Sequence, residues 1–407
     1  MAPDRTPHPH YYEVQYVYQP IEFLLSESDS TVHILNRDHF TQRDEYEYYC
    51  EIYHNGELVT GELARVDGNW SFNVPYPYYP YDDAELILNV YARLRQATPW
   101  APEGFVVARQ QVVLKPEEFW SAFGGKPAKV QKSAAGLTAY TDRGAITINS
   151  LGALTSWIVD GQERLKAPLE PYFWKPENDN QHAAHFAERL GVWRDALDKR
   201  INKSFRTENS DDGLKIISET TLPIGAELTI TYTITQDGRM KVDMDYQPTG
   251  SDIPLIPKFG MRMRLPADYT DIEYYGRGPW ENYPDRKRSA FIGRYQMPLS
   301  EYETEYIHPQ DNGNRCDIRW FHISSGKKEL RISGLQPLCI RAWDYGEEDL
   351  EPATHPYEIQ RGMYVNPNID LNVHGVGGID TWGQRTLPQY TIDGNKPYHY
   401  AFTMEWQ

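Results

Sequence analysis

Alternation of apolar and polar side chains with a period of two dominates this chain of 407 residues. The clearest case is a pair of runs, residues 228–234 and 240–246, separated by the turn sequence Gln236-Asp237-Gly238. Residues two apart lie on the same face of a strand, so each run has one apolar face, and such a turn is typical of a β-hairpin. The pattern predicts an all-β fold.

Shorter alternating runs fill residues 21–114. Residues 46–53 alternate and lead into Asn55-Gly56, a strong hairpin signal, and further runs follow at residues 70–74, 86–90 and 106–114. Short strands at this spacing predict an immunoglobulin-like β-sandwich. Pro75, Pro77 and Pro80 indicate a loop or an edge strand, because proline cannot donate to a sheet ladder.

Residues 115–128 have the composition of a linker, and residues 129–407 form a second, larger β-domain in this interpretation. One segment departs from the β pattern. Its apolar residues recur at intervals of three and four, which predicts one amphipathic helix of about four turns. These residues are Ala183, Phe186, Leu190, Trp193 and Leu197. At the N-terminus, residues 11–23 are expected to be extended.

The net charge of the chain excludes some classes of binding partner. The formal net charge of −17 at pH 7 argues against binding to nucleic acid or to an anionic membrane, since both require a positive surface. Three cysteines, Cys50, Cys316 and Cys339, leave the redox compartment and the localisation open. The histidine pairs His8/His10 and His182/His185 each lack a third ligand, so no metal site is predicted.

Residues 274–295 contain the densest run of turn-forming and binding-type residues, YYGRGPWENYPDRKRSAFIGRY. Two glycines and two prolines shape its backbone. The side chains that we expect to contact a ligand or a neighbouring domain include Arg277, Glu281, Asn282 and Asp285. The alternative is a surface loop held by ion pairs between acidic residues and arginines.

A glycine-rich tract, residues 374–383, is the sharpest candidate for a ligand site. It contains His374, Asp380 and Trp382, and its glycines allow close approach of the backbone. An indole face packs against the apolar face of a pyranose, and a carboxylate accepts hydrogen bonds from sugar hydroxyls. The alternative is a Trp382 buried in the domain core.

A third tract, residues 171–181, ends with Asp179 and Asn180, which we consider as binding or interface residues. The alternative is that residues 178–180 cap the helix that follows, since Asn and Asp are good N-cap residues.

Together these tracts resemble the C-terminal region of the large β-galactosidases of glycoside hydrolase family 2. That family's pattern G-x-G-P-x-E-N-Y-x-D-R is filled from Gly276 to Arg286, and Tyr302, residues 309–313 and Arg315 follow. Residues 4–9 reproduce D-R-T-P-H-P, which closes the family's catalytic barrel. Residues 171–180 resemble F-x-R-A-P-x-D-N-D, with Lys175 in place of arginine. In G-x-G-G-D-x-S-W, Trp382 and Asp380 match, whereas Ile379 departs.

The resemblance implies a fold, a set of domains and a role. Residues 1–20 would be the tail of a missing catalytic barrel or a linker, residues 21–114 the immunoglobulin-like sandwich, 115–128 a linker, and 129–407 a galactose-mutarotase-like supersandwich. The parent enzyme would hydrolyse terminal β-D-galactosides with retention, and this portion would supply one wall of the active-site mouth through Trp382. The family's Asn-Glu acid/base dipeptide does not occur in the sequence. No catalytic residue is therefore assigned, and the chain alone is expected to be inactive.

The expected partners are a galactoside or galactose and the catalytic barrel, and a homo-oligomer stays open. No cofactor is expected in this chain, because divalent and monovalent cations belong to the catalytic barrel of the parent. One alternative is a free-standing galactose-binding module or accessory small subunit. Another is an aldose 1-epimerase that uses His374 with Glu281, since the supersandwich is shared with such enzymes.

Overall fold

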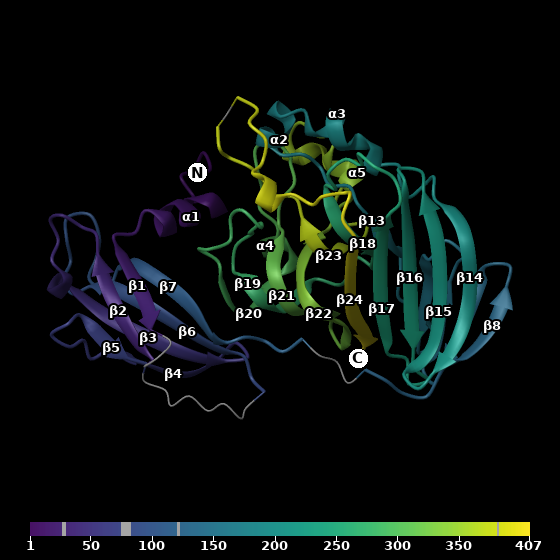
Figure 1. Cartoon of the computed structure of the whole chain (residues 1–407), viewed down its shortest axis with the longest axis horizontal. Helices are drawn as coiled ribbons and strands as arrows, with labels where there is room; N and C mark the ends of the chain where they lie inside the picture. Colours follow the sequence, from purple (N-terminus) through teal and green to yellow (C-terminus); the bar gives the residue numbers. More distant parts are fainter. Residues whose placement is uncertain (27–29, 75–82, 120–122, 381) are drawn as a thin grey trace. The chain divides into compact units, whose positions relative to one another are not determined.

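The computed structural model describes residues 1–26, 30–74, 83–119, 123–380 and 382–407. Beyond the first two residues, the chain divides into two compact units, residues 3–118 with 288–294 and residues 119–287 with 295–407. Figure 1 shows the elements of both units with their labels. The prolines at 75, 77 and 80 and part of the expected linker lie outside the described residues.

The first unit contains two small antiparallel sheets. One consists of β1 (Ile21–Ser26), β2 (Thr31–Asn36) and β5 (Ser71–Asn73), and the other has the order β4 (Glu57–Leu63), β3 (Tyr46–His54), β6 (Leu86–Leu94), β7 (Val106–Lys115). Alternate residues of β3, from Tyr46 to Ile52, are buried. They pack in one cluster with residues of β1, β2 and β6, such as Phe23, Val32 and Leu88. The predicted small β-sandwich is confirmed.

The N-terminal segment is helical where an extended segment was expected, so that prediction was wrong. Helix α1 spans Pro9–Val17 and is followed by β1. Proline is favoured in the first turn of a helix, where its missing donor costs nothing. The carboxylate of Glu13 also accepts hydrogen bonds from the backbone N–H groups of Arg288 and Ser289, at 3.1 and 2.9 Å. That contact is between residues far apart in sequence, so no local pattern signals it.

The second unit is a large antiparallel β-structure. Its early strands are β8 (Lys129–Ser133), β9 (Gly136–Thr141), β10 (Gly144–Ile148), β11 (Leu154–Val159), β12 (Gln162–Glu163) and β13 (Ala167–Tyr172). The middle strands are β14 (Ile201–Ser210), β15 (Gly213–Leu222), β16 (Ala226–Ile234), β17 (Met240–Pro248) and β18 (Lys258–Arg264). The late strands are β19 (Asp271–Gly278), β21 (Arg315–Ser325), β22 (Lys328–Trp343), β23 (Asn366–Val373) and β24 (Tyr398–Trp406), and β20 (Phe291–Pro298) begins within the segment assigned to the first unit.

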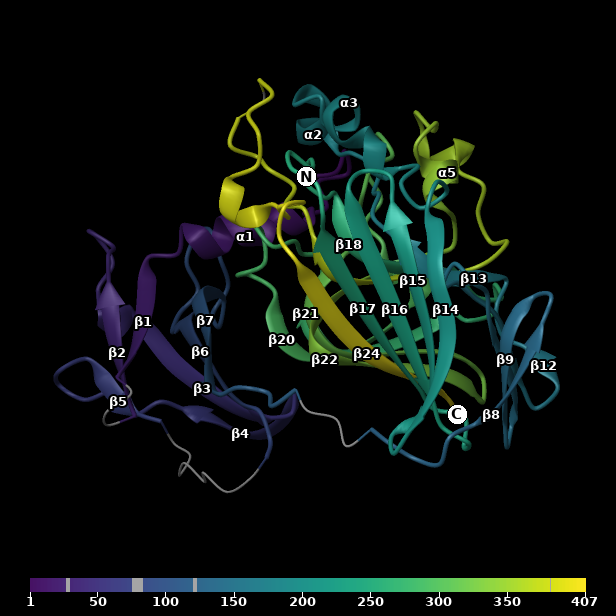
Figure 2. The same ribbon diagram turned by 45° about the vertical axis from the view of Figure 1, so that its right-hand side comes forward.

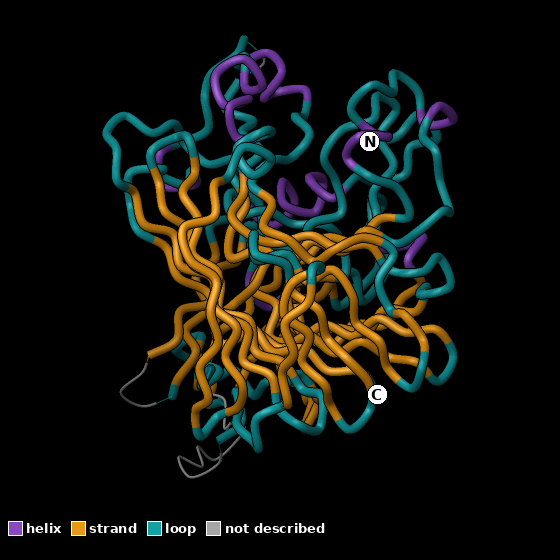
Figure 3. The backbone as a smooth tube through the Cα atoms, turned by 90° about the vertical axis from the view of Figure 1, so that its right-hand side faces the viewer, coloured by secondary structure: helices purple, strands orange, loops and turns teal. Residues whose placement is uncertain are grey.

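Strand β22 joins two antiparallel sets of strands. Its first half pairs with β24, which continues through β17, β16 and β15 to β14. Its second half pairs with β23, which continues through β18 and β13 to β11. Figure 2 shows β14 to β17 and β24 side by side, and Figure 3 shows how strands dominate the backbone. The predicted all-β fold with a large second domain is confirmed.

The hairpin predicted from alternation is present in the expected register. Strands β16 and β17 pair so that Ile230 lies opposite Met244 and Tyr232 opposite Val242. All four side chains are at most 1% exposed. Period-two alternation therefore identified both the strands and their buried face.

The prediction of one continuous amphipathic helix was wrong, because the helix is interrupted. The segment forms α2 (Asp179–Ala183), α3 (Phe186–Leu190) and the 3-10 turn η2 (Gly191–Trp193). His185 breaks it in a left-handed conformation with φ of 53°. The apolar residues Phe186, Leu190 and Trp193 are nevertheless buried. The spacing thus predicted the burial of these residues and of Leu197, but Ala183 is exposed and the break was missed.

The remaining helical elements are single turns. They are η1 (Arg43–Glu45), α4 (Leu299–Tyr302), α5 (Glu347–Leu350), η3 (Pro356–Glu358) and η4 (Pro388–Tyr390). Within the residues that the structure describes, no helix has the length and apolar character needed to cross a membrane.

Replacing Gly276 by alanine should destabilise the second unit. Gly276 lies in β19, where a Cβ atom would stand 2.4 Å from Cδ1 and 2.9 Å from Cα of Ile318. Overpacking of this kind costs about 1–3 kcal/mol. Denaturant unfolding followed by tryptophan fluorescence measures the loss. Gly191→Ala is the matched control, since a Cβ there meets nothing within 4 Å. Equal stability of the two variants would contradict the packing argument.

Candidate functional site

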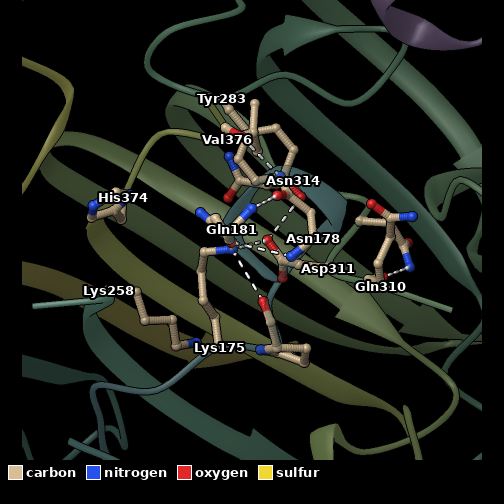
Figure 4. A network of polar contacts seen from close by, with 12 residues as sticks. Lys175, Asn178, Gln181, Lys258, Tyr283, Gln310, Asp311, Asn314, His374 and Val376 are labelled. Carbon is tan, nitrogen blue, oxygen red and sulfur yellow. Dashed lines mark hydrogen bonds and ion pairs between the residues drawn. The ribbon is translucent and has the colours of Figure 1, made fainter. Parts of the chain in front are cut away.

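Lys175 lies at the centre of the candidate site and is completely buried. Its Nζ atom donates to Oε1 of Gln181 at 2.8 Å and to the carbonyl oxygen of Pro176 at 3.1 Å, and it forms an ion pair with Oδ2 of Asp311 at 3.1 Å (Figure 4). Burial lowers the pKa of Lys175, and the negative charge of Asp311 opposes this effect. The ammonium is thus held by one carboxylate and two neutral acceptors.

Asp311 connects this lysine to two other parts of the unit. Its Oδ2 also accepts from the hydroxyl of Tyr283 at 3.0 Å, and its Oδ1 pairs with Nη1 of Arg341 at 2.7 Å. Arg341 also pairs with Glu347, which is buried as well. Two cations and two carboxylates therefore balance inside the fold. Pairing of this sort is what allows charges to remain buried.

The residues of α2 connect the buried pair to the glycine-rich tract. Nε2 of Gln181 donates to the carbonyl oxygen of Gly375 at 3.0 Å, and Nδ2 of Asn178 donates to that of Val376 at 3.1 Å. Oδ1 of Asn178 accepts from the backbone N–H of Gln181 at 2.9 Å, which caps α2. The capping alternative is confirmed for Asn178, which also holds the tract, whereas Asp179 and Asn180 lie within α2.

Asp285 fixes the same tract from the other side. Its two carboxylate oxygens accept from the backbone N–H groups of Val376 and Gly377 at 3.0 and 2.8 Å. Gly375 has no side chain to obstruct this approach, since a Cβ there would lie 2.7 Å from Oδ2 of Asp285. The structure therefore brings the 274–295 tract and the 374–383 tract together through one carboxylate.

Three other predicted residues of the 274–295 tract are engaged inside the fold. Glu281, 2% exposed, accepts from Nη2 of Arg286 at 2.6 Å, from the hydroxyl of Tyr306 and from the N–H of Gly313 at 2.8 Å. Asn282 is also buried and accepts from the N–H of Cys316 at 2.8 Å. Arg277 pairs with Asp317. Ion pairs do hold the tract, as its alternative interpretation stated, but the tract is largely buried.

Asp179 and Asn180 lie at the start of α2. Oδ2 of Asp179 accepts from Nε2 of Gln310 at 3.1 Å, and the residue is exposed. Nδ2 of Asn180 approaches the carbonyl oxygen of Val376 at 3.4 Å. Residues of the three tracts 171–181, 274–295 and 309–313 thus meet around the base of the glycine-rich tract, residues 374–383.

Trp382 lies on the loop that follows β23 and is 87% exposed, so it is not a core residue. In Figure 1 this loop projects beyond the ends of the strands of its unit. Oδ1 of Asp380 accepts from the backbone N–H groups of Trp382 and Gln384 at 2.9 and 3.2 Å. Asp380 therefore shapes the loop that presents the indole. Thr381, between them, lies outside the described residues.

His374 is separated from Trp382 by the loop and is only 4% exposed. Its Nδ1 atom lies 2.9 Å from the carbonyl oxygen of Gly375, and its ring packs edge-on against Phe186 with centroids 5.2 Å apart. Burial lowers the pKa of His374 to about 4, so the imidazole is neutral at pH 7. It lines a cavity of about 550 Å³, and neither Trp382 nor Asp380 belongs to the described residues of that lining.

The sequence of this chain matches two families. Residues 144–404 match the family described as the β-galactosidase small chain, and residues 32–115 match β-galactosidase domain 4. Both are domains of the β-galactosidase class, in agreement with a small sandwich followed by a large β-domain. The match to the small-chain family covers more than half of this chain, so the chain belongs to the β-galactosidase small-chain family.

Curated relatives are longer than this chain. The β-galactosidase of Priestia megaterium is 30% identical over 99% of this chain and 40% of its own length. That of Lactobacillus delbrueckii subsp. bulgaricus is 30% identical over 97% of this chain and 39% of its own length. The chain thus spans about 40% of the relatives that it matches.

Among solved structures, a galactose 1-epimerase from Lactobacillus acidophilus matches with a TM-score of 0.42 and 10% identity, over 69% of this chain and 98% of the other. A galactose mutarotase-like protein from Lactobacillus casei matches with a TM-score of 0.37 and 12% identity, over 69% of this chain and 100% of the other.

Sequence reasoning missed the residues beneath the site. Arg341 lies within a strand, and no local pattern marks it as a partner of Asp311. Gln181 and Asp311 were part of matched tracts but were not assigned a role. Arg189 and Arg385, which line the cavity beside His374, were also missed. Lys175 was noted only as a departure from the family's arginine, and no buried network was predicted from it.

The depressed pKa of His374 should make stability depend on pH. The unfolded imidazole takes up a proton below about pH 6.5, whereas the folded one stays neutral until about pH 4, so acidification between these values favours unfolding. As the pH falls through this range, the free energy of unfolding of the wild-type protein should decrease by about 3 kcal/mol more than that of His374→Asn.

Asp370 opposes this effect, since burial raises its pKa to about 6 and its folded form gains a proton first. The comparison with the variant, by denaturant unfolding at a series of pH values, removes that shared contribution. Parallel curves for the two proteins would contradict the assignment to His374.

Asp285→Asn should loosen the base of the Trp382 loop. Asparagine keeps one acceptor oxygen, so one of the N–H groups of Val376 and Gly377 loses its partner. A lost hydrogen bond of this kind costs about 1–3 kcal/mol, which corresponds to amide exchange roughly 5- to 150-fold faster. Hydrogen exchange at these two amides measures it, with Asp195→Asn on the exposed surface as control. Unchanged protection would show that the loop is held without Asp285.

Proposed function

We propose that this chain is the C-terminal, non-catalytic portion of a β-galactosidase, an enzyme that hydrolyses terminal non-reducing β-D-galactosides. The observation that carries the proposal is Trp382, an indole 87% exposed on a loop whose base is fixed by buried groups. An indole on a loop held at its base presents a large, flat apolar face that can pack against a ligand or a partner. The family membership makes a galactoside the ligand of choice.

In this proposal Trp382 forms one wall of the active-site mouth. Its ring packs against the apolar face of the sugar or its aglycone, and the loop geometry set by Asp380 determines the orientation of that ring. Among the described residues none donates a hydrogen bond to Oδ2 of Asp380, so this oxygen is available to a sugar hydroxyl. In this proposal His374, which lines the cavity behind the loop, does not contact the galactoside that packs against Trp382.

Catalysis would come from the preceding domain of the longer protein. Retaining hydrolysis needs a proton donor and a nucleophile about 5 Å apart. Glu281, the acid that an epimerase mechanism would pair with His374, already accepts from Arg286, Tyr306 and Gly313, so no observation favours the epimerase. The retaining pair, and the cations expected in the parent enzyme, are assigned to the catalytic barrel, which is the proposed partner of this chain.

A chimaera tests the proposal. This chain would replace the matching 40% of the Priestia megaterium β-galactosidase, and hydrolysis of nitrophenyl β-galactoside would be measured. We expect an active chimaera and no activity from this chain alone. Trp382→Ala should raise KM by about 5- to 30-fold, which corresponds to a loss of roughly 1–2 kcal/mol of apolar contact.

Trp100→Ala serves as the control for this substitution, since Trp100 is also exposed, at 66%, but lies in the first unit. A Trp382→Ala chimaera with wild-type KM would remove the proposed role of the indole. Hydrolysis by the chain alone that vanished on mutation of one of its own carboxylates would overturn the non-catalytic assignment.

A titration of this chain with galactose, followed by tryptophan fluorescence, separates the main proposal from the binding-module alternative. We expect no saturable change, because the other walls of the pocket would belong to the catalytic domain. Saturation that is lost in Trp382→Ala would instead favour a module that binds galactose by itself.

A further inference from the structure

The cavity behind the Trp382 loop has an unusual lining for a protein of net charge −17. Its volume is about 550 Å³, and it lies between α2 and α3 on one side and residues 376–391 on the other. Its described lining contains two arginines, Arg189 and Arg385, one histidine, His374, and no acidic residue. Apolar side chains complete the walls, among them Phe186, Leu255, Ile379 and Leu387. A mostly apolar cavity with a few convergent polar groups is the usual form of a small-molecule site.

Among the described residues, no carboxylate forms an ion pair with either arginine. Nε of Arg189 donates to the carbonyl oxygen of Ala184 at 3.0 Å, which orients the guanidinium but leaves its charge unpaired. No hydrogen bond or ion pair from the described residues reaches Arg385. The positive charge of Arg385 is close enough to Arg189 to lower the pKa of that residue, in addition to the larger effect of burial. Two like charges that face one cavity repel each other, and a bound anion would relieve the repulsion.

His374 adds an acceptor to this set of donors. Because its Nδ1 atom bonds to the carbonyl oxygen of Gly375, that atom carries the proton, and Nε2 of the neutral ring has a free lone pair. None of the described residues bonds to Nε2. A cavity lined by a neutral imidazole and two guanidinium groups suits a ligand that has both a hydroxyl group and an anionic group.

We propose that this cavity binds a hydroxylated organic anion, such as a sugar that carries a phosphate or a carboxylate. Arg189 and Arg385 hold the anionic group, Nε2 of His374 accepts from a hydroxyl, and the apolar walls cover the carbon skeleton. This site is distinct from the proposed contact of Trp382 with a galactoside, because Trp382 does not belong to the described lining. Arg189 is in α3 and Arg385 is in the loop, so the ligand would join them and hold the loop against the helix.

Calorimetric titration of the complete chain with three matched sugars tests the proposal. Galactose 6-phosphate and galacturonate carry the two anionic groups, and galactose is their neutral counterpart. We expect at least one of the anionic sugars to bind at least tenfold more tightly than galactose, with an affinity that falls as salt is added. The stronger of the two identifies phosphate or carboxylate as the preferred group. Inorganic phosphate should bind more weakly than the sugar phosphate, since it leaves the apolar walls uncovered.

Substitutions locate the binding. Arg385→Gln and Arg189→Gln should each weaken binding of the preferred anion about tenfold or more, as expected for a hydrogen bond to a charged group. Arg385 is exposed, so its variant keeps the fold even if loss of the bond from Arg189 to Ala184 disturbs α3. Arg206→Gln, on the exposed strand β14, is the control and should leave the affinity unchanged. Trp382→Ala should also leave it unchanged, which separates this site from the proposed galactoside contact.

Three results would overturn the proposal. These are the absence of saturable binding of either anionic sugar up to high millimolar concentration, equal binding of galactose, and full affinity in Arg385→Gln. None of them bears on the proposed role of Trp382, which depends on the chimaera.

Discussion

The second unit depends on the buried ion pair between Lys175 and Asp311. Removing two charges from water is costly, and a single pair at 3.1 Å does not by itself offset that cost. Here Asp311 also binds Arg341 and Tyr283, while Lys175 binds two neutral oxygens. The carboxylate of Asp311 is therefore fully paired only when tracts distant in sequence have come together. The pair therefore specifies one arrangement of the tracts as much as it stabilises them.

A series of hydrogen bonds connects this buried ion pair to the loop that carries Trp382. Lys175 holds Gln181, Gln181 holds the carbonyl oxygen of Gly375, and Asp285 holds the next two amides. From that base the chain reaches Trp382, whose indole lies in solvent. The loop is anchored at its base and braced near its tip by Asp380, a combination that suits presentation of one rigid aromatic face to a partner.

Local patterns predicted the strands well because, in a strand with one buried face, apolar residues stand at every second position, as in β16 and β17. They failed at α1, where Glu13 of the helix accepts from backbone N–H groups far along the chain, and at His185, which adopts a left-handed conformation. The sequence motifs located the residues of the site but did not predict which side chains pair with one another. Arg341 pairs with Asp311 across 30 positions of sequence, and the two arginines of the cavity share no motif, so only the folded chain could bring them together.

Strand β22 has a consequence for the order of events during synthesis. It pairs with β24 through its first half and with β23 through its second half, and β13 pairs with β18 only after β14 to β17 have been made. Sheets closed by such distant segments have high contact order and fold slowly. On the ribosome β13 and β17 must therefore wait, each with an unpaired edge, until β18 and β24 emerge. A chaperone that shields strand edges would therefore act mainly on the second unit.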